Sequence, residues 1–258
     1  MNRVVVITGS NSGIGRALKQ KFEKAGDIVI GVNIDGAFDD KKEFFADVSN
    51  EQVVKEVFEK IGVLYSKIDI LINCAGYAVF GAVELIPSAS AKNMFDVNYF
   101  GTMYCINSAL KYMQKGAKIF NISSACAFYC VPFRTHYSAS KAAVSMLSYG
   151  LRMELKDSGI DVVAICPGDV KTNFSKNRKK TLETNFRYGD RILKNAEKID
   201  KRENKRMSVE YATNKMFKIM NKKKTNPMYI VGKNIKFLHF ASRFISTKTL
   251  LHFTNKMF

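Results

Sequence analysis

Two short segments of the chain combine residue types that can exchange protons. Ser123 and Ser124 stand together, and 13 residues beyond Ser124 comes Tyr137, followed four positions later by Lys141. On a helix, this spacing of four places the phenol and the ammonium group on one face. An ammonium group held there lowers the pKa of the phenol, so that Tyr137 can exchange a proton near neutral pH. With a serine hydroxyl arriving from another element, the set predicts an acid–base site for an alcohol–carbonyl pair.

The same spacing also occurs in ordinary amphipathic helices, so Tyr137 and Lys141 need support from the rest of the chain. A β-branched run from Arg3 to Thr8 ends in a glycine-rich turn, and apolar residues then follow helical spacing from Ile14 to Lys24. Glycines in this position let the backbone approach a pyrophosphate, which binds the free N–H groups of the helix N-terminus. The start of the chain therefore predicts a dinucleotide site.

The residue that meets the adenine ribose is expected about 20 positions after such a turn. Asn33 and Asp35 are the candidates, and neither is basic. Because a 2′-phosphate requires an Arg or Lys, this end of the strand favours NAD over NADP. Lys41 and Lys42 follow a few residues later and leave NADP as the alternative.

Strand and helix patterns alternate through the first two thirds of the chain. Apolar runs predict strands at 3–8, 28–32, 43–46, 68–72, 118–122 and 160–165, and apolar periodicity predicts helices at 14–24, 51–65, 91–113 and 136–156. This alternation is typical of an α/β fold with a Rossmann-like, doubly wound parallel sheet flanked by helices. The strand at 118–122 delivers Ser123 and Ser124 to the carboxyl edge of that sheet, where ligands of such folds bind.

Beyond Thr172 the pattern loosens. Residues 173–206 are polar and basic without clear periodicity, and we expect a substrate lid or a flexible insertion rather than core. A helix at 208–220 with Ser208 as its N-cap and a strand at 228–231 follow, and the tail at 235–258 mixes phenylalanines with lysines. We therefore expect a single domain over 1–258, with a cofactor-binding and catalytic core at 1–172 and a basic lid and extension at 173–258.

In this order and at these spacings, residues 3 to 172 resemble the classical short-chain dehydrogenase/reductase (SDR) family. Thr8–Gly15 resembles the cofactor turn of that family, Asp47–Val48 the pair that contacts adenine, Asn73–Gly76 the segment that stabilises the central sheet, and Pro167–Thr172 the motif beside the nicotinamide. Cys74 replaces an asparagine that is common in the family. Asn33 stands where members that prefer NAD commonly have aspartate, and Ile34 where members that prefer NADP often have arginine.

The resemblance implies an NAD(P)-dependent oxidoreductase whose catalytic residues are Asn98, Ser124, Tyr137 and Lys141. In this scheme Tyr137 exchanges the proton of the substrate oxygen, Lys141 lowers its pKa and holds the nicotinamide ribose, Ser124 hydrogen-bonds the substrate, and Asn98 supports a water. The cofactor-binding residues that it implies are Gly9, Ser12, Gly13, Ile14, Gly15, Asn33, Asp47, Val48, Asn73, Ala75, Gly76, Tyr137, Lys141, Pro167, Gly168, Val170 and Thr172. Family members associate as homodimers or homotetramers through two long helices, expected here at 91–113 and 136–156.

An apolar run from Ala127 to Phe133 lies between the catalytic serine and tyrosine and is expected to line the pocket. It predicts a hydrophobic secondary alcohol or ketone as substrate, such as a steroid-like, isoprenoid or acyl alcohol. The same fold serves many substrates, so this expectation is an analogy. The alternative function is a non-catalytic dinucleotide-binding sensor or scaffold that acts through the basic end of the chain. The intact set of Asn98, Ser124, Tyr137 and Lys141 argues against that alternative.

The chain has a net charge of +18 that is concentrated in its last third. Residues 1–172 hold 19 Lys and Arg against 17 Asp and Glu, whereas residues 173–258 hold 22 against 6. Three interpretations remain open: a solvated face, capture of an anionic substrate by Arg178, Lys179, Lys180 or Arg187, and contact of the tail with an anionic membrane. Nucleic acid is not expected as a partner, because no reader motif accompanies the charge.

Composition sets the remaining bounds. With 258 residues of which 47% are hydrophobic, the chain has ample material for one large core, which excludes a disordered protein. The five cysteines form no Cys-x-x-Cys pair and the three histidines have no metal-ligand spacing, so we expect reduced thiols and no metal. No signal segment or apolar run of membrane-spanning length is apparent, and the expected location is the cytoplasm, with peripheral membrane contact as an option.

Overall fold

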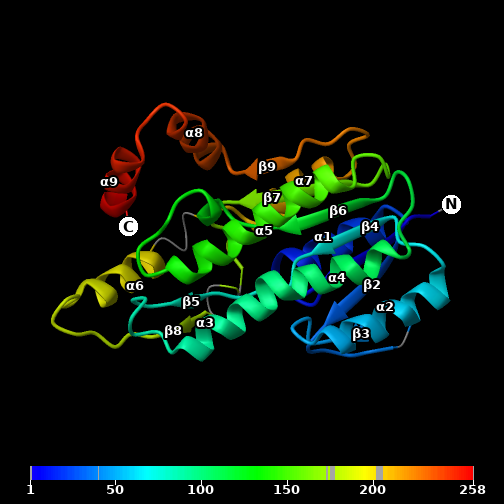
Figure 1. Ribbon diagram of the computed structural model, residues 1–258, viewed down its shortest axis with the longest axis horizontal. Coiled ribbons are helices and arrows are strands. Elements are labelled where there is room, and N and C mark those ends of the chain that lie inside the picture. Colours follow the sequence, from blue (N-terminus) through cyan, green and yellow to red (C-terminus); the bar gives the residue numbers. More distant parts are fainter. Residues whose placement is uncertain (1, 40, 173, 175–177, 202–205, 258) are drawn as a thin grey trace.

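A seven-stranded parallel sheet forms the centre of the protein in the computed structural model, which describes residues 2–39, 41–172, 174, 178–201 and 206–257 (Figure 1). Its strands are β1 (Val4–Thr8), β2 (Ile28–Asn33), β3 (Glu43–Phe45), β4 (Ile70–Asn73), β6 (Lys118–Ile122), β7 (Asp161–Pro167) and β9 (Met228–Val231). Their order across the sheet is β3-β2-β1-β4-β6-β7-β9. The order reverses between β1 and β4, which makes their carboxyl ends the expected ligand site. The predicted Rossmann-like α/β fold is confirmed.

Helices cover both faces of this sheet. On one face lie α2 (Glu51–Tyr65), α4 (Gly101–Leu110) and α5 (Thr135–Glu154), and on the other α1 (Gly13–Lys24) and α7 (Val209–Met220). The strands β1 and β4 are buried along their whole length. Because α1, α2 and α7 carry one apolar stripe each, each helix buries that stripe against the sheet. Ser208 caps α7 as predicted, since its side chain accepts a hydrogen bond from the Tyr211 N–H.

The turn from β1 into α1 requires glycine for close approach. Gly9 has a φ of 66°, and a Cβ at this position would lie 3.0 Å from Cα of Ala75, just beyond β4. A Cβ on Gly15 would collide with the carbonyl oxygen of Gly9. Any larger residue at these two positions would therefore push the turn away from the sheet.

The long helix expected at 91–113 is divided by a π-helical turn. It consists of α3 (Ser88–Phe95), the π-turn Asp96–Phe100 and α4, followed by a loop to β6. Asn98 lies in the middle of this turn and is fully buried. Such turns widen the helix by one residue and are frequent at functional sites. The side-chain periodicity of the sequence does not register this local change.

The segment expected to be a lid outside the core contains a packed helix. After the short strand β8 (Lys179–Lys180), which pairs with β5 (Val79–Phe80), the chain forms α6 (Arg191–Lys201). Ile192, Ala196 and Ile199 of α6 are buried against Phe80 and Phe133 in a small separate cluster. The prediction that 173–206 contributes no core is therefore wrong for α6, because three apolar residues at helical spacing are enough to bury one stripe.

The last two helices, α8 (Lys233–Ser242) and α9 (Thr247–Met257), lie at one end of the molecule, away from the N-terminus (Figure 1). No residue of α8 is fully buried. None of the helices in the described part of the chain is long and apolar enough to cross a membrane.

The packing of α6 can be tested with a pair of neighbouring residues. Replacing Ile192, which is 0% exposed, by alanine should lower the free energy of unfolding by about 2–5 kcal/mol, because it leaves a cavity. Replacing Leu193, which is 43% exposed, should change it by less than about 1 kcal/mol. Urea unfolding followed by circular dichroism measures both values. Equal effects of the two substitutions would contradict the packed helix.

Candidate active site

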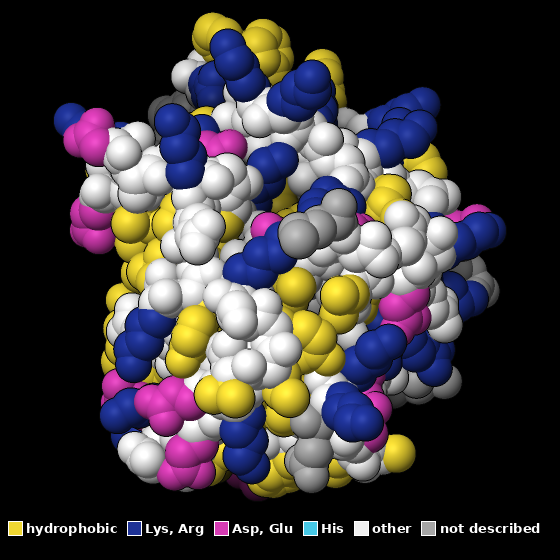
Figure 2. All heavy atoms as spheres, turned by 90° about the vertical axis from the view of Figure 1, so that its right-hand side faces the viewer, with side chains coloured by type: hydrophobic (Ala, Val, Ile, Leu, Met, Phe, Trp, Pro, Cys, Tyr) yellow, Lys and Arg dark blue, Asp and Glu magenta, His cyan; other side chains and the backbone are white. Residues whose placement is uncertain are grey.

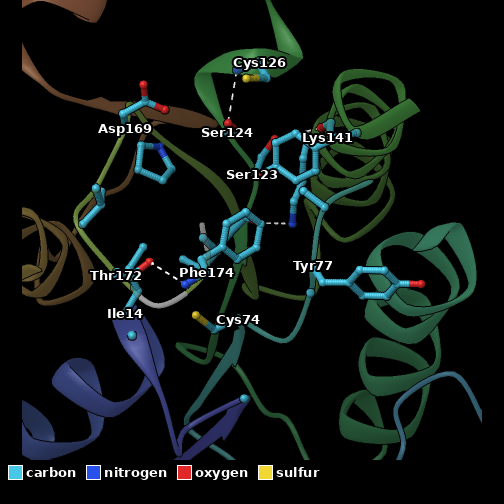
Figure 3. A pocket seen from close by; sticks show the side chains of 18 of the residues that line it. Ile14, Cys74, Tyr77, Ser123, Ser124, Cys126, Lys141, Asp169, Thr172 and Phe174 are labelled. Atoms are coloured by element: carbon cyan, nitrogen blue, oxygen red, sulfur yellow. Dashed lines mark hydrogen bonds between the residues drawn. The ribbon is translucent and has the colours of Figure 1, made fainter. Parts of the chain in front are cut away.

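The carboxyl edge of the sheet brings together the side chains that the sequence singled out. Ser123 and Ser124 follow β6, while Tyr137 and Lys141 lie one turn apart near the start of α5. All four line one cavity of about 240 Å³, together with residues of the glycine-rich turn and of the segment after β7. Figure 3 shows Ser124 and Lys141 on one side of this cavity, and Ile14 and Thr172 on the opposite side.

The two serines have different tasks. The Ser124 hydroxyl lies close enough to the phenol of Tyr137 to lower its pKa, and it accepts a hydrogen bond from the Cys126 N–H at 3.2 Å. The Ser123 hydroxyl donates to the Lys141 carbonyl at 2.8 Å and contacts the Ser145 hydroxyl. Ser123 therefore fastens β6 to α5, and Ser124 is the serine that faces the tyrosine.

Burial controls the proton affinity of Tyr137. The ring is tilted against that of Phe174, with 5.8 Å between the ring centroids. Burial raises the pKa of this phenol well above its ordinary value, and the hydrogen bond from Ser124 offsets only part of the shift. This differs from the expectation that Lys141 lowers the pKa, because the desolvation of the phenolate outweighs the charges around it. Tyr137 is consequently a neutral phenol at pH 7.

Lys141 is buried below the tyrosine. Its ammonium group donates to the Ile122 carbonyl at 3.0 Å and lies 6.0 Å from the centroid of the Tyr137 ring. Burial lowers the pKa of Lys141 to about 8, against the opposing effect of the Cys74 and Cys166 thiols. The side chain is therefore close to the point where it exchanges its proton at physiological pH.

Asn98 is held by the π-turn in a network of its own. Its amide accepts from the Tyr77 N–H and donates to the Tyr77 carbonyl and to the Ser140 hydroxyl, each at 3.0 Å. Gly76 separates this amide from Lys141, and a Cβ on Gly76 would lie 2.7 Å from Oδ1 of Asn98 and 3.4 Å from Nζ of Lys141. Asn98 thus stands beside Lys141 with its orientation determined by the backbone.

The cavity has features that fit a dinucleotide. Ser12 makes no side-chain cap at the start of α1, and the first turn of this helix contains no acidic residue. Its N–H groups and the positive end of the helix dipole are therefore available to a pyrophosphate. Of the predicted cofactor residues, those that line this cavity are Gly9, Ser12, Gly13, Ile14, Ala75, Gly76, Tyr137, Lys141, Pro167, Gly168, Val170 and Thr172.

The other predicted cofactor residues lie outside that lining. Asn33 is 3% exposed, and its amide hydrogen-bonds the Asn11 N–H at 3.0 Å and the Ser10 hydroxyl at 2.9 Å. It therefore supports the glycine-rich turn from behind. The Asp47 carboxylate accepts from the N–H and hydroxyl of Ser49. Three further residues are packed inside the protein: Gly15 and Val48 against backbone and side chains, and Asn73 through a hydrogen bond to Asn121.

Two further arginines lie at or near the catalytic cavity, and the sequence analysis named neither of them. Arg134, three residues before Tyr137, lines the cavity with its side chain 6% exposed and pairs with Asp169 at 3.8 Å. Arg206 lies near enough to Arg178 for its positive charge to lower the pKa of Arg178. The spacing of Arg134 from the tyrosine was a usable signal. Arg206 could only be located from the fold, because it lies far from the site in the sequence.

Of the four basic lid residues proposed as anion ligands, only Arg178 lines the catalytic cavity. Burial, followed by the charges of Arg134 and Arg206, lowers the pKa of Arg178 to about 10. Lys180 instead pairs with Asp200 at 3.0 Å, and Arg187 with Glu84 at 2.6 Å. Lys179 lies over the ring of Tyr77 at 5.4 Å from its centroid.

A second, larger cavity of about 580 Å³ adjoins the catalytic one. The two share Ser124, Cys126, Arg134, Gly168 and Asp169 in their linings. Apolar side chains form much of its remaining wall: Tyr129, Val131, Met207, Ile235 and Leu238. Of the run from Ala127 to Phe133, only Tyr129 and Val131 line this space, while Phe133 packs against α6.

Comparison with known proteins identifies the family. The model of the short chain dehydrogenase family matches residues 3–183. The chain is 33% identical over 207 residues to a 3-ketodihydrosphingosine reductase of Bacteroides thetaiotaomicron, covering 78% of this chain and 77% of that one. It is 31% identical over 198 residues to a 3beta-hydroxysteroid dehydrogenase of Mediterraneibacter gnavus, covering 70% and 71%. The chain belongs to the short-chain dehydrogenase family, and it is an NAD(P)-dependent oxidoreductase that acts on CH–OH groups.

Solved structures agree on the fold. A short-chain dehydrogenase from Streptomyces avermitilis superposes with a TM-score of 0.84 over 100% of this chain and 98% of its own, at 24% identity. A relative from Burkholderia phymatum in complex with NAD gives 0.78 over 94% and 95%, at 20% identity. ElxO with NADP bound gives 0.71 over 90% and 97%, at 22% identity. Both dinucleotides thus occur on this fold.

The lowered pKa of Lys141 predicts a measurable pH dependence. Between the folded-state pKa of about 8 and the ordinary lysine value of 10.5, the unfolded chain binds more protons at this residue than the folded chain. Relative to the Lys141→Met variant, the wild type should therefore gain up to about 3 kcal/mol of stability as the pH rises through this interval. Urea unfolding of both proteins at pH 7, 8, 9 and 10 measures the difference. A constant difference would contradict the buried, partly neutral amine.

Proposed function

We propose that this protein interconverts a hydrophobic secondary alcohol and the corresponding ketone, with Tyr137 as the general acid and base. The observation that supports this most is the placement of the Tyr137 phenol within hydrogen-bonding reach of Ser124 and directly above the Lys141 side chain, in the cavity that also contains the glycine-rich turn. A substrate oxygen between the two hydroxyls would receive both of their hydrogen bonds. That is the geometry needed to move a proton at a carbonyl oxygen.

A nicotinamide cofactor supplies the hydride when it is bound, and the chain supplies the proton and the positioning. In the direction of reduction, the neutral Tyr137 donates its proton as negative charge develops on the substrate oxygen. Its raised pKa keeps that proton in place until the substrate arrives. Ser124 donates a second hydrogen bond to the same oxygen, which stabilises the charge.

Lys141 and Asn98 complete the proton path. The Tyr137 phenolate left after reduction lies next to the Lys141 ammonium group, whose pKa of about 8 suits the return of a proton near neutral pH. Asn98 lies on the far side of Gly76 from this amine and is held by both backbone groups of Tyr77. In our proposal its amide orients a water that reprotonates Lys141.

Replacing Tyr137 by phenylalanine tests this role. Turnover should fall by about 10²-fold or more, because general acid catalysis is lost, while NADH affinity stays within about twofold of wild type. Tyr149, which lies on the same helix and whose hydroxyl contacts Met228, is the matched control, and Tyr149→Phe should retain turnover. A panel of ketones with NADH and NADPH, followed by nicotinamide absorbance, gives both values. Turnover of Tyr137→Phe within tenfold of wild type would exclude the proposed role.

The second cavity supports the choice of a hydrophobic substrate. It begins at Ser124 and continues between apolar side chains towards α8, so a substrate with its carbonyl at Tyr137 extends into it. The named activities of two relatives, on 3-ketodihydrosphingosine and on a 3beta-hydroxysteroid, are also reactions of large apolar molecules. We propose an acyl, isoprenoid or steroid-like chain as the apolar part.

The arginines at the junction of the cavities add an anionic group to this substrate. Arg134 and Arg178 both line the catalytic cavity, with Asp169 as the carboxylate among its lining residues. Nε of Arg178 is buried and has no hydrogen-bond partner among the residues that the structure describes. A carboxylate, sulfate or phosphate on the substrate would satisfy this donor and offset the mutual repulsion of the guanidinium groups.

Arg178→Gln should separate anionic from neutral substrates. For ketones with a carboxylate or sulfate, kcat/KM should fall by about 10- to 100-fold, as expected for a hydrogen bond to a charged group, while neutral analogues of equal length change by less than about threefold. Lys179→Gln, which removes the neighbouring exposed charge, is the control. An equal loss for charged and neutral ketones would show that Arg178 is structural.

Three further points belong to the proposal. We infer a preference for NAD, because the carboxyl end of β2 carries Asn33, Ile34 and Asp35 rather than an Arg or Lys.

We infer a homodimer or homotetramer formed through α4 and α5, since Met146 and Met153 of α5 are 67% and 70% exposed. The five cysteines are free thiols, in keeping with a cytoplasmic protein.

A further inference from the structure

The outer side of α8 exposes a row of aromatic side chains. Phe237 and Phe240 are 73% and 60% exposed, and their spacing of three places them on one side of the helix. Phe244, two residues after the helix ends, is 75% exposed. The rings of Phe240 and Phe244 pack edge to face, with 5.3 Å between their centroids. On α9, Leu251 and Phe253 are 50% and 53% exposed. A gathering of large apolar side chains on a surface marks a site of interaction.

Basic residues alternate with these rings. Lys233, Lys236 and Arg243 lie on or next to α8, and Lys248 and Lys256 on α9. Residues 211–258 contain ten Lys and Arg and no Asp or Glu at all. Figure 2 shows the side of the molecule that lies on the right in Figure 1, away from α9, and there Asp and Glu side chains are interspersed with Lys and Arg.

The inner side of α8 faces the second cavity. Ile235 and Leu238 line its apolar wall, and Lys233 and Asn234 lie at the same end of it. Thr254 of α9 completes the lining there. The helix that carries the exposed phenylalanines is therefore also the outer wall of the space that we assign to the apolar part of the substrate.

Charge decides which partner suits this surface. A second copy of the chain would bring an equally basic segment against it, and like charges repel at short distance. A protein partner would have to supply an acidic and apolar face of matching shape. An anionic bilayer offers negative headgroups to Lys and Arg and an interfacial apolar layer to phenylalanine, and it does not need a matching shape.

We propose that the α8–α9 surface, formed by Phe237, Phe240 and Phe244 with Leu251, Phe253 and the surrounding Lys and Arg, docks on an anionic lipid bilayer. Docking would place the wall of the second cavity against the membrane, from which a lipophilic substrate enters. The docking step does not depend on the proposed function; the delivery of substrate does, because it requires the assigned cavity and reaction.

Co-sedimentation of the full chain with sucrose-loaded vesicles tests docking without reference to catalysis. With vesicles of 7:3 phosphatidylcholine and phosphatidylglycerol in 0.1 M NaCl, most of the protein should pellet, and with phosphatidylcholine alone little should. The triple variant Phe237→Ser/Phe240→Ser/Phe244→Ser should reduce partitioning by about tenfold or more. Lys236→Gln/Arg243→Gln should also reduce it, and raising NaCl to 0.5 M should weaken wild-type binding.

A control pair removes equally exposed apolar side chains from other surfaces. Val63 and Phe186 are 83% and 89% exposed, and Val63→Ser/Phe186→Ser should pellet like wild type. Melting temperatures and NADH affinity of all variants should match the wild type, since none of these residues lines either cavity.

Three outcomes would overturn the proposal. The first is a wild-type protein that stays in the supernatant with anionic vesicles. The second is a triple variant that pellets as well as wild type, which would reduce the effect to adsorption of a basic protein. The third is a triple variant that no longer pellets and that light scattering shows to have dissociated from an oligomer. That result would assign the surface to a second copy of the chain. Turnover of a short, water-soluble ketone by the wild type is measured in parallel. An absence of turnover would count against the proposed function alone, because docking is measured separately.

Discussion

The burial of one ammonium group shapes the whole active site. Lys141 lies under Tyr137 with its charge turned towards the Ile122 carbonyl at the end of β6, and there it is almost removed from water. Desolvation brings its pKa down to about 8. The surrounding glycines, serines and π-turn can all be understood as the packing that this position requires, because a larger residue at Gly76 would meet both Lys141 and Asn98.

The parallel sheet provides the place in which Lys141 can be buried. Its order reverses between β1 and β4, so the loops after these strands diverge and leave an opening above their carboxyl ends. The glycine-rich turn, the Asn98 network and the serine pair enter the opening from three directions. Each is fastened by its own backbone or side-chain hydrogen bonds, such as the one from the Ser123 hydroxyl to the Lys141 carbonyl. The candidate catalytic groups are thereby positioned before any ligand binds.

The basic last third of the chain divides into parts with different surroundings. Lys180 and Arg187 pair with carboxylates on the surface, whereas Arg178 reaches the catalytic cavity. The charges of α8 and α9 have no acidic residue in their own segment and accompany exposed phenylalanines. A single figure for net charge therefore combines a solvated surface with two surfaces for which we propose roles, one in substrate contact and one in membrane docking. Large hydrophobic substrates and docking on a bilayer would suit each other, since such molecules partition into lipid.

The sequence by itself determined the fold class and located the candidate catalytic residues. Period-two and period-3.6 patterns are local, and a strand, turn and helix with glycines in the turn can be recognised without any distant contact. Four-residue spacing was likewise enough to place Tyr137 and Lys141 on one side of α5.

Only the tertiary structure decided which groups share a cavity and how burial changes them. The π-turn at Asn98, the packed face of α6, the inward turn of Asn33 and the meeting of Arg134 with Arg178 all depend on residues far apart in the chain. The direction of the pKa shift of Tyr137 shows the reason most clearly. Sequence spacing reports a neighbouring charge, but the cost of removing a phenolate from water depends on everything that surrounds it, and that is known only when the chain is folded.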